Sequence, residues 1–164
     1  MQETGGDPLQ LRDADPDDLD ALAELWRNAW RDGHIDHVPP ALAELRTPES
    51  FRARLEPMIG DTRVCEIDGL TAGFCTLKDD ELNQLMVSAE ARGAGVAAAL
   101  MQDAETRLKR AGHGQAWLAC AVGNERAAAF YRKSGWHVAD TVTLAVETLG
   151  DPFPLRVWRF EKTL

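Results

Sequence analysis

The feature that most constrains the fold is a glycine-rich turn at residues 91–95, because it separates a strand pattern from a helix pattern. Before the turn, Leu82–Val87 predicts a strand. Beyond it, apolar residues recur at the spacing of one helix face, at Val96, Leu100, Ala104 and Leu108. They predict a helix from about Gly95 to Arg110. This succession indicates a domain of mixed α and β structure.

The rest of the chain supplies further strand and helix patterns. Strands are predicted at Leu9–Arg12, Thr62–Ile67, Leu70–Leu77, Gln115–Val122, His137–Val146 and Pro154–Glu161. Helices are predicted from Leu19 to Gly33, from Thr47 to about Glu56 and from Asn124 to Ser134. The stretch His34–Arg46 contains Pro39 and Pro40 and receives no assignment. No internal repeat is present, so we expect one domain over residues 1–164, in which residues 1–8 form a flexible N-terminus.

The charge balance and the apolar runs exclude two classes of partner. The chain has 27 acidic and 18 basic residues, a formal net charge of −9, which argues against nucleic-acid binding and fits a cationic partner better. Apolar runs such as Val96–Met101 are far too short to span a membrane, and the first residues lack a secretion signal. We therefore expect a cytoplasmic protein in which Cys65, Cys75 and Cys120 are buried free thiols.

The glycine-rich turn partly matches a dinucleotide-binding pattern. Residues 93–98 read Gly-Ala-Gly-Val-Ala-Ala, which fits G-x-G-x-x-A. A dinucleotide site also needs an acidic residue about 20 positions on, where this chain has His113. A nucleoside triphosphate loop needs Gly-Lys-Ser/Thr, which the turn lacks. Backbone N–H groups at a helix start are nevertheless unpaired, so Arg92–Ala97 can form a cradle for an anion.

Two linked motifs point to a family. The first, Arg92-Gly93-Ala94-Gly95-Val96-Ala97, reads Arg-x-x-Gly-x-Ala and follows the strand end Leu85-Met86-Val87. The second consists of Asn124, Ala128, Tyr131 and Gly135-Trp136. With both, the sequence resembles the GNAT acyltransferase superfamily over residues 80–137. The resemblance implies an α+β fold, in which a mixed, mostly antiparallel sheet of six to seven strands is flanked by about four helices and splays open between the strands at 82–87 and 115–122.

The resemblance further implies that acetyl-CoA (coenzyme A) is the acyl donor and that no metal is needed. The turn would hold the pyrophosphate, and the backbone around Met86 and Val87 would pair with the pantetheine arm. The implied donor-binding residues are Leu85, Met86, Val87, Arg92, Gly93, Ala94, Gly95, Val96, Ala97, Asn124, Arg126, Tyr131 and Lys133. Asn124 is a helix N-cap first and a donor contact second. Arg126 and Lys133 could equally belong to a solvated helix face.

Two residues are candidates for proton transfer. Tyr131, the only tyrosine of the chain, is by resemblance the general acid that protonates the departing thiolate. The alternative is a half-buried aromatic side chain whose hydroxyl faces water. Glu81 is by resemblance the general base at the start of its strand. The alternatives are a solvated acidic turn at residues 79–81, Asp79 or Asp80 as the base instead, and a water relay in place of a dedicated base.

The acceptor is expected to be a primary amine, in a small molecule or in a peptide or protein, and its identity stays open. By resemblance, Trp30, His34 and His37 are its candidate contacts. The two histidines make a poor metal site because no third ligand accompanies them. Cys120 has no neighbouring histidine to activate it as a nucleophile. Homodimers are frequent in the family, although residues 137–164, which often contribute to them, show no diagnostic pattern.

The predicted function is therefore an N-acetyltransferase that works by direct attack of the amine in a ternary complex. The acetyl group is inferred from the commonest usage in the family. The alternative function is a coenzyme A-binding regulatory or sensor module that keeps the fold and has lost turnover. A third, nicotinamide binding, requires an affinity for NAD that we do not expect.

Overall fold

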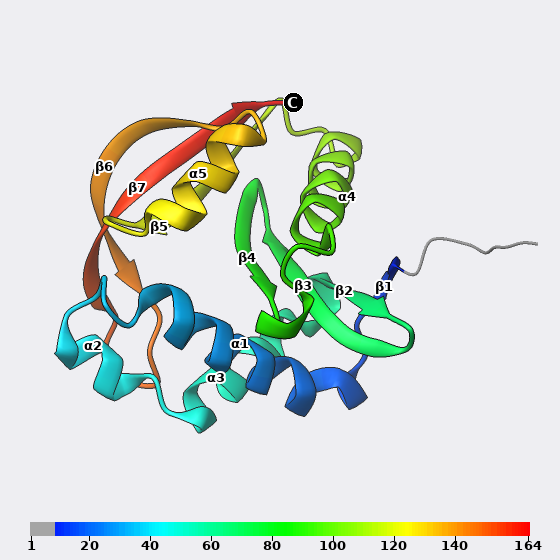
Figure 1. Cartoon of the computed structure of the whole chain (residues 1–164). Helices are drawn as coiled ribbons and strands as arrows, with labels where there is room; N and C mark the ends of the chain where they lie inside the picture. The colour runs from blue at the N-terminus through cyan, green and yellow to red at the C-terminus, as the bar shows by residue number, and fades with distance from the viewer. Residues whose placement is uncertain (1–8) are drawn as a thin grey trace, which may run out of the picture.

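In the computed structural model, which describes residues 9–164, seven strands form one sheet in the order β1-β2-β3-β4-β5-β7-β6 (Figure 1). The strands are β1 (Leu9–Asp13), β2 (Thr62–Ile67), β3 (Leu70–Lys78), β4 (Glu81–Val87), β5 (Gln115–Ala121), β6 (His137–Val146) and β7 (Phe153–Thr163). Only β4 and β5 are parallel neighbours in this part of the chain. The predicted mixed, mostly antiparallel sheet is thus confirmed. The predicted flexible N-terminus, residues 1–8, lies outside the described residues.

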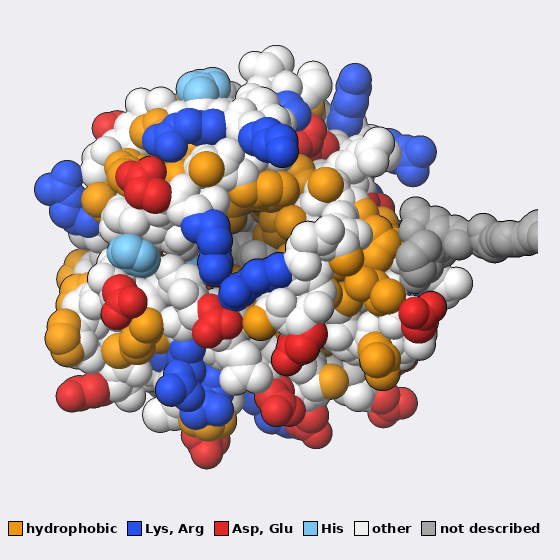
Figure 2. Space-filling model, viewed as in Figure 1, with side chains coloured by type: hydrophobic (Ala, Val, Ile, Leu, Met, Phe, Trp, Pro, Cys, Tyr) orange, Lys and Arg blue, Asp and Glu red, His pale blue; other side chains and the backbone are white. Residues whose placement is uncertain are grey.

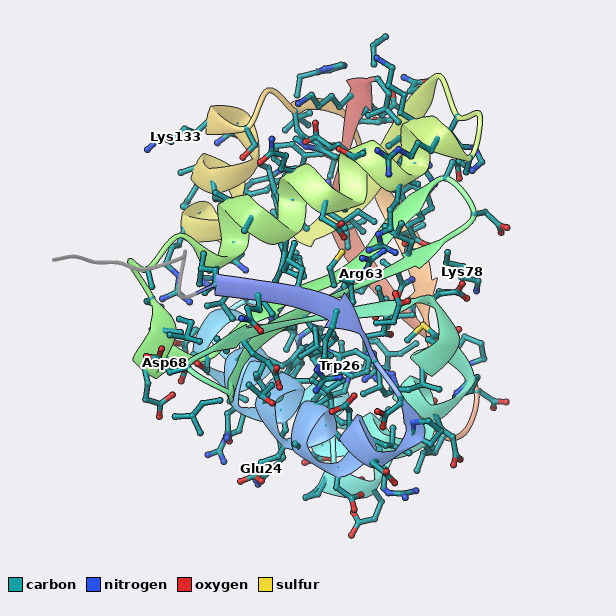
Figure 3. The ribbon with its side chains drawn as sticks, turned by 90° about the vertical axis from the view of Figure 1, so that its right-hand side faces the viewer. Glu24, Trp26, Arg63, Asp68, Lys78 and Lys133 are labelled. Atoms are coloured by element: carbon teal, nitrogen blue, oxygen red, sulfur yellow. The ribbon has the colours of Figure 1, made fainter. Side chains whose placement is uncertain are left out.

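Helices cover both faces of the sheet. They are α1 (Leu19–His34), α2 (Pro40–Leu45), α3 (Pro48–Leu55), α4 (Val96–Arg110) and α5 (Glu125–Lys133), with 3-10 turns at Pro16–Asp18, Glu56–Asp61 and Ala89–Ala91. α1 and α3 pack on one face, and α4 and α5 pack on the other (Figure 1; Figure 3). About four helices were expected, and α2 is the addition, because Pro40 occupies the first helical position, where proline's missing N–H costs nothing. Within residues 9–164, no helix is long and apolar enough to cross a membrane.

Aromatic side chains hold α1 against the sheet. The turn that leads into α1 is capped by Asp15, whose carboxylate accepts a hydrogen bond from the Asp17 N–H at 2.8 Å. Trp26 points from α1 toward the sheet (Figure 3), and its ring centroid lies 5.2 Å from that of Phe51 on α3 and 6.2 Å from that of Phe74 on β3. These edge-to-face contacts fix the position of α1 on the sheet.

A β-bulge in β4 determines which of its side chains face α4. The pairing with β3 shifts so that Asn83 is an extra residue. Leu82 before the bulge and Leu85 and Val87 after it all pack into the core beneath α4. In a regular strand, a spacing of three would place Leu82 and Leu85 on opposite faces. Met86 packs into the other core, beneath α1, so each helix meets its own row of β4 side chains.

β4 and β5 are joined at one end and diverge at the other. Within the described residues, their pairing consists of Glu81 opposite Trp117. The Trp117 backbone N–H donates to the Asp80 C=O at 3.2 Å, and its indole Nε1 donates to the Asp80 carboxylate at 3.1 Å. The predicted splay between these two strands is therefore confirmed.

Gly73 on β3 allows α4 to approach the sheet closely. A Cβ atom at this position would lie 2.7 Å from the Met86 carbonyl oxygen, 2.8 Å from Val96 Cγ1 and 3.2 Å from Leu100 Cδ1. The first two distances are shorter than any normal contact, so a side chain at position 73 would push the first turn of α4 outward. The absence of a side chain at Gly73 thus keeps the start of α4 next to β4.

Candidate functional site

A cavity of about 850 Å³ lies where β4 and β5 diverge. Figure 2 shows hydrophobic side chains inside a hollow on this face, with Lys and Arg side chains around it. The predicted site residues that line the cavity are Trp30, His34, Glu81, Leu85, Met86, Val87, Arg92, Gly93, Gly95, Val96, Ala97, Asn124, Arg126, Tyr131 and Lys133. Two others, His37 and Ala94, do not line it.

The turn before α4 presents unpaired backbone N–H groups. Gly93 (φ +84°) and Gly95 (φ +86°) adopt the left-handed conformation that favours glycine. Within residues 9–164, no acceptor is found for the N–H groups of Gly93, Gly95, Val96, Ala97 and Ala98. The Ala94 N–H differs, because it donates to the Ala91 C=O at 3.2 Å. Free N–H groups at the positive end of a helix dipole make this turn suitable for an anion.

Arg92 extends from this turn toward α1. Its Nη2 lies 3.1 Å from a carboxylate oxygen of Asp32, and both side chains are about half exposed. An exposed ion pair of this kind contributes about 1 kcal/mol at most. The guanidinium can therefore exchange Asp32 for another anion near the turn at little cost.

One edge of β4 has no partner strand beyond the junction with β5. On the other edge, the Ser88 N–H donates to the Ala72 C=O at 2.8 Å. Because hydrogen-bonded and non-hydrogen-bonded pairs alternate in an antiparallel ladder, the backbone groups of Leu85 and Val87 point away from β3 and toward the open edge. A ligand with amide groups can pair with this edge as an added strand would.

Tyr131 on α5 places a neutral phenol in the cavity wall. Its ring centroid lies 5.5 Å from that of Phe160 and 5.7 Å from that of Phe130. Burial raises the pKa of Tyr131 above its ordinary value of 10, and the nearby thiols of Cys120 and Cys75 raise it further. Its hydroxyl makes no hydrogen bond with any described residue. The O–H group is thus protonated at pH 7 and available as a donor.

Glu81 lies at the first position of β4, beside the junction of the two strands. It is half-buried, and its carboxylate accepts a hydrogen bond from Asn83 Nδ2 at 3.1 Å. Burial raises the pKa of Glu81 above its ordinary value of 4.5, although the Asn83 hydrogen bond and the charge of Lys78 act in the opposite direction. A carboxylate with a raised pKa is a stronger base than an exposed one.

α5 contributes a cap and two basic side chains to the cavity. Asn124 is buried, and its side chain accepts a hydrogen bond from the Ala127 N–H at 3.4 Å, which is the predicted N-cap contact. Arg126 and Lys133 are exposed side chains that line the cavity. Figure 3 shows Lys133 extending from α5 away from the sheet.

The three predicted acceptor contacts lie in different environments. Trp30 is buried and lines the cavity, and the His34 ring stacks on it with centroids 5.7 Å apart. Burial lowers the pKa of His34 to about 4, so its ring is neutral at pH 7. His37 is exposed and does not line the cavity. Its ring lies beside Gly123, where an added Cβ atom would be 3.1 Å from His37 Nδ1.

The cavity is basic although the chain as a whole is acidic. The basic residues that line it are Arg46, Arg54, Lys78, Arg92, Arg126 and Lys133, and the acidic ones are Glu81 and Glu147. The sequence patterns did not single out Arg46 or Arg54 for the site. Arg54 does follow Phe51 by three residues on α3, which puts it beside the apolar face of that helix and was the available signal.

Metal ligands and reactive thiols were also sought among the described residues. Residues 9–164 hold no group of three or more His, Cys, Asp or Glu side chains placed to bind a metal ion. Cys65, Cys75 and Cys120 are buried thiols outside any disulfide bond, as predicted. Burial raises the pKa of Cys120 to about 12, which leaves almost no thiolate to act as a nucleophile.

The fold matches solved acetyltransferase structures along nearly the whole chain. A GCN5-related N-acetyltransferase from Rhodopseudomonas palustris is 21% identical, with a TM-score of 0.78 and 99% of both chains covered. The PaiA N-acetyltransferase from Thermoplasma acidophilum, solved with coenzyme A, is 21% identical, with a TM-score of 0.76 over 95% of this chain and 99% of that one. The protein yncA from Salmonella typhimurium, solved with its cofactor acetyl-CoA, is 15% identical, with a TM-score of 0.66 over 95% of this chain and 94% of that one. At these identities the similarity shows the fold.

A family model adds a sequence-level match. No curated protein sequence matches the chain. The model of the Acetyltransferase (GNAT) family matches residues 19–136, more than two thirds of the 164 residues. This range contains the turn before α4, Glu81 and Tyr131. The chain therefore belongs to the GNAT acetyltransferase family.

Proposed function

We propose that this chain is an acetyl-CoA-dependent N-acetyltransferase that acetylates a primary amine by direct attack in a ternary complex. The observation that carries the proposal is that one cavity is lined by the turn before α4, the open edge of β4, Glu81 and Tyr131. An anion cradle, a backbone edge, a base and an acid are the groups that such a transfer requires.

The residues present fit coenzyme A. The unpaired N–H groups at the start of α4 match the pyrophosphate, since they offer several donors at the positive end of a helix dipole. The outward-facing backbone of Leu85 and Val87 matches the two amides of the pantetheine arm. Arg92, Arg126 and Lys133 add positive charge near the phosphates.

Glu81 would accept the proton of the attacking amine. Deprotonating a lysine-like amine with a pKa of about 10.4 costs roughly 4 to 5 kcal/mol of free energy at pH 7, so a base within the site is useful. The half-buried carboxylate of Glu81, with its raised pKa, suits this role better than an exposed carboxylate. It receives the proton directly or through one water.

Tyr131 would donate its hydroxyl proton to the leaving sulfur. In water, a phenol with a raised pKa is a poor acid toward a thiolate, whose ordinary pKa is about 8.5. Cys120 shows how a thiol behaves at this wall, because it lines the same cavity and burial raises its pKa to about 12. Burial that raises the pKa of Tyr131 would raise that of a departing thiol at the same wall too, so the proton transfer is less unfavourable there than the values in water suggest.

The transfer balances with these residues. Bound acetyl-CoA would supply the acetyl group and a thiol leaving group. As the bond from nitrogen to the acetyl carbon forms and the carbon–sulfur bond breaks, the electron pair of that bond goes to sulfur. Glu81 takes a proton from nitrogen, and Tyr131 gives one to sulfur; exchange with solvent then restores both side chains.

The test is thiol release from acetyl-CoA by the full chain with a mixed panel of amines. We expect release that depends on the amine, and a loss of about a hundredfold or more in kcat for Tyr131→Phe with an unchanged Kd for coenzyme A. Because Tyr131 is the only tyrosine, the tyrosinate absorbance reports its pKa directly, and the titration should lie above 10. Tight coenzyme binding without turnover of any amine would instead identify a regulatory or sensor module.

A further inference from the structure

Two arginines lie together at one end of the cavity. Arg46 follows α2, and Arg54 lies on α3; both line the cavity. Arg46 is 9% exposed. The Arg54 guanidinium lies over the Trp26 ring, with its carbon 4.3 Å from the ring centroid. Both charges are therefore held in place inside the molecule rather than solvated at its surface.

Most of the hydrogen-bonding capacity of these arginines is unused. The Nε of Arg46 and the Nε and Nη1 of Arg54 are sealed from solvent and have no partner among residues 9–164. Arg46 Nη1 donates to the backbone C=O of Glu147, a neutral acceptor. The Nη2 group of Arg54 is not sealed in this way, and it too has no partner among the described residues.

No carboxylate of the described chain neutralises the pair. Neither arginine forms an ion pair within residues 9–164. The acid whose charge acts on both is Glu147, but its side chain is 64% exposed and lies 3.8 Å from Lys78. Burial and the neighbouring arginine lower the pKa of Arg54 to about 9, and burial lowers that of Arg46 to about 10. Two adjacent buried cations without an anion are costly in the free protein.

We infer that the acceptor carries a carboxylate in addition to its amine, as a free amino acid does, and that Arg46 and Arg54 bind this carboxylate. The accessible Nη groups offer the donors that a carboxylate accepts, and its charge would offset both guanidinium charges. The inference rests on the proposed acetyl transfer and names the class of amine. It also narrows the expectation of a cationic partner, because Arg46, Arg54 and Lys78 repel a second positive charge at this end of the cavity.

The candidate base lies at the same end of the cavity. Arg46 contacts the backbone of Glu147, and the Glu147 side chain lies 3.8 Å from Lys78 Nζ. Lys78 in turn is the cross-strand partner of Glu81. A small molecule whose carboxylate rests on Arg46 and Arg54 therefore has its amine in the region of Glu81.

The experiment compares kcat/KM for each of several L-amino acids with that for its amide and its decarboxylated amine, with the full chain and saturating acetyl-CoA. We expect the amino acid to be preferred over its amide by between about tenfold and a hundredfold. The amine of the amide is less basic than that of the amino acid, so a larger fraction of it is unprotonated and reactive at pH 8. This difference favours the amide, so a preference for the amino acid cannot arise from amine basicity. If wild type acetylates amides or polyamines as well as amino acids, the inference is overturned while the proposed function stands. If coenzyme A binds but no amine reacts, both are overturned.

Variants separate carboxylate recognition from folding. Arg46→Gln and Arg54→Gln should each lower kcat/KM for the amino acid by about tenfold or more and bring its preference over the amide toward one, with the Kd for coenzyme A unchanged. The preference is a ratio within one preparation, so a reduced folded fraction cancels out. Arg52→Gln is the matched control, because Arg52 lies on the same helix, is half exposed and pairs with Asp20 at 2.7 Å. An intact preference in both cavity variants would overturn the inference.

Discussion

Replacing Gly73 by alanine tests whether the close approach of α4 to the sheet positions the anion-binding turn. The new Cβ would lie 2.8 Å from Val96 Cγ1 and 2.7 Å from the Met86 carbonyl oxygen. Restoring an ordinary contact of 3.4 Å to Val96 requires a movement of about 0.6 Å. The first turn of α4 can relieve the contact with Val96, whereas the contact with the Met86 oxygen lies between two strands and requires the sheet backbone itself to shift.

The expected loss of stability follows from two opposing terms. Overpacking of this kind costs about 1 to 3 kcal/mol. The loss of glycine's freedom in the unfolded chain returns about 0.5 to 1 kcal/mol. The middle of the resulting range, a net loss of about 1 kcal/mol, corresponds to a Tm lowered by about 2 to 4 °C for a chain of this length. A displacement of this size should also weaken coenzyme A binding by about tenfold, since the N–H groups move with the helix.

Calorimetry measures both quantities, the Tm and the Kd of coenzyme A, for wild type and for Gly73→Ala. Gly60→Ala is the matched control, because nothing lies within 4 Å of a Cβ at Gly60 and its backbone is not left-handed. It should leave both quantities close to those of wild type. A Gly73→Ala protein with the wild-type Tm and Kd would refute the packing argument. A lowered Tm with an unchanged Kd would show that the turn does not move with α4.

Two further predictions concern charged residues of the site. Because burial raises the pKa of Glu81 above 4.5, kcat/KM should rise with pH as this carboxylate loses its proton, and Glu81→Gln should abolish this acid limb and lower the rate by about a hundredfold. Because the folded state favours the neutral form of Glu81, the wild-type protein should lose stability as the pH rises and this buried carboxyl group ionises. Glu81→Gln, which does not ionise, should lose less stability over the same pH range. Arg92→Gln should weaken coenzyme A binding by about tenfold or more, as measured by calorimetry at low salt, and leave the Tm nearly unchanged. Asp32→Asn removes the ion-pair partner of Arg92 and leaves the positive charge of Arg92 in place, so it should not weaken coenzyme A binding.

The elements around the site were predictable because their signals are local. The four-residue spacing of Val96 and Leu100 and the two left-handed glycines before them specify the start of α4 without reference to the rest of the chain. Asn124 likewise caps α5 through a contact three residues away. The helix α2 was missed, although its signal is also local, because Pro40 was interpreted as a breaker rather than as a first helical residue.

The parts that were not predicted depend on contacts between distant segments. Asn83 is an extra residue only in relation to the pairing of β4 with β3. Gly73 matters only because Val96 and Leu100 pack over it from α4. Arg54 looks like a solvated helix residue until Trp26 is placed beneath it. No single stretch of sequence contains these relationships.

The net charge could not predict the charge of the cavity, for a different reason. A sum of −9 over the whole chain contains no information about position, whereas the cavity gathers Arg46, Arg54 and Lys78 at one end and Arg92, Arg126 and Lys133 among its remaining lining residues. The acidic residues lie mostly elsewhere. The partner of a site is recognised by the local charges of that site.

The junction of Glu81 with Trp117 acts as a pivot within the sheet. It joins β1–β4 to β5–β7 through one residue pair and the Trp117 hydrogen bonds to Asp80. A small rotation about this point changes the width of the cavity without breaking another strand-to-strand hydrogen bond. Hydrogen bonding between neighbouring strands is thus sparsest along the line where coenzyme A is proposed to bind. A molecule that spans β4 and α5 would stiffen the whole protein and not merely fill its cavity.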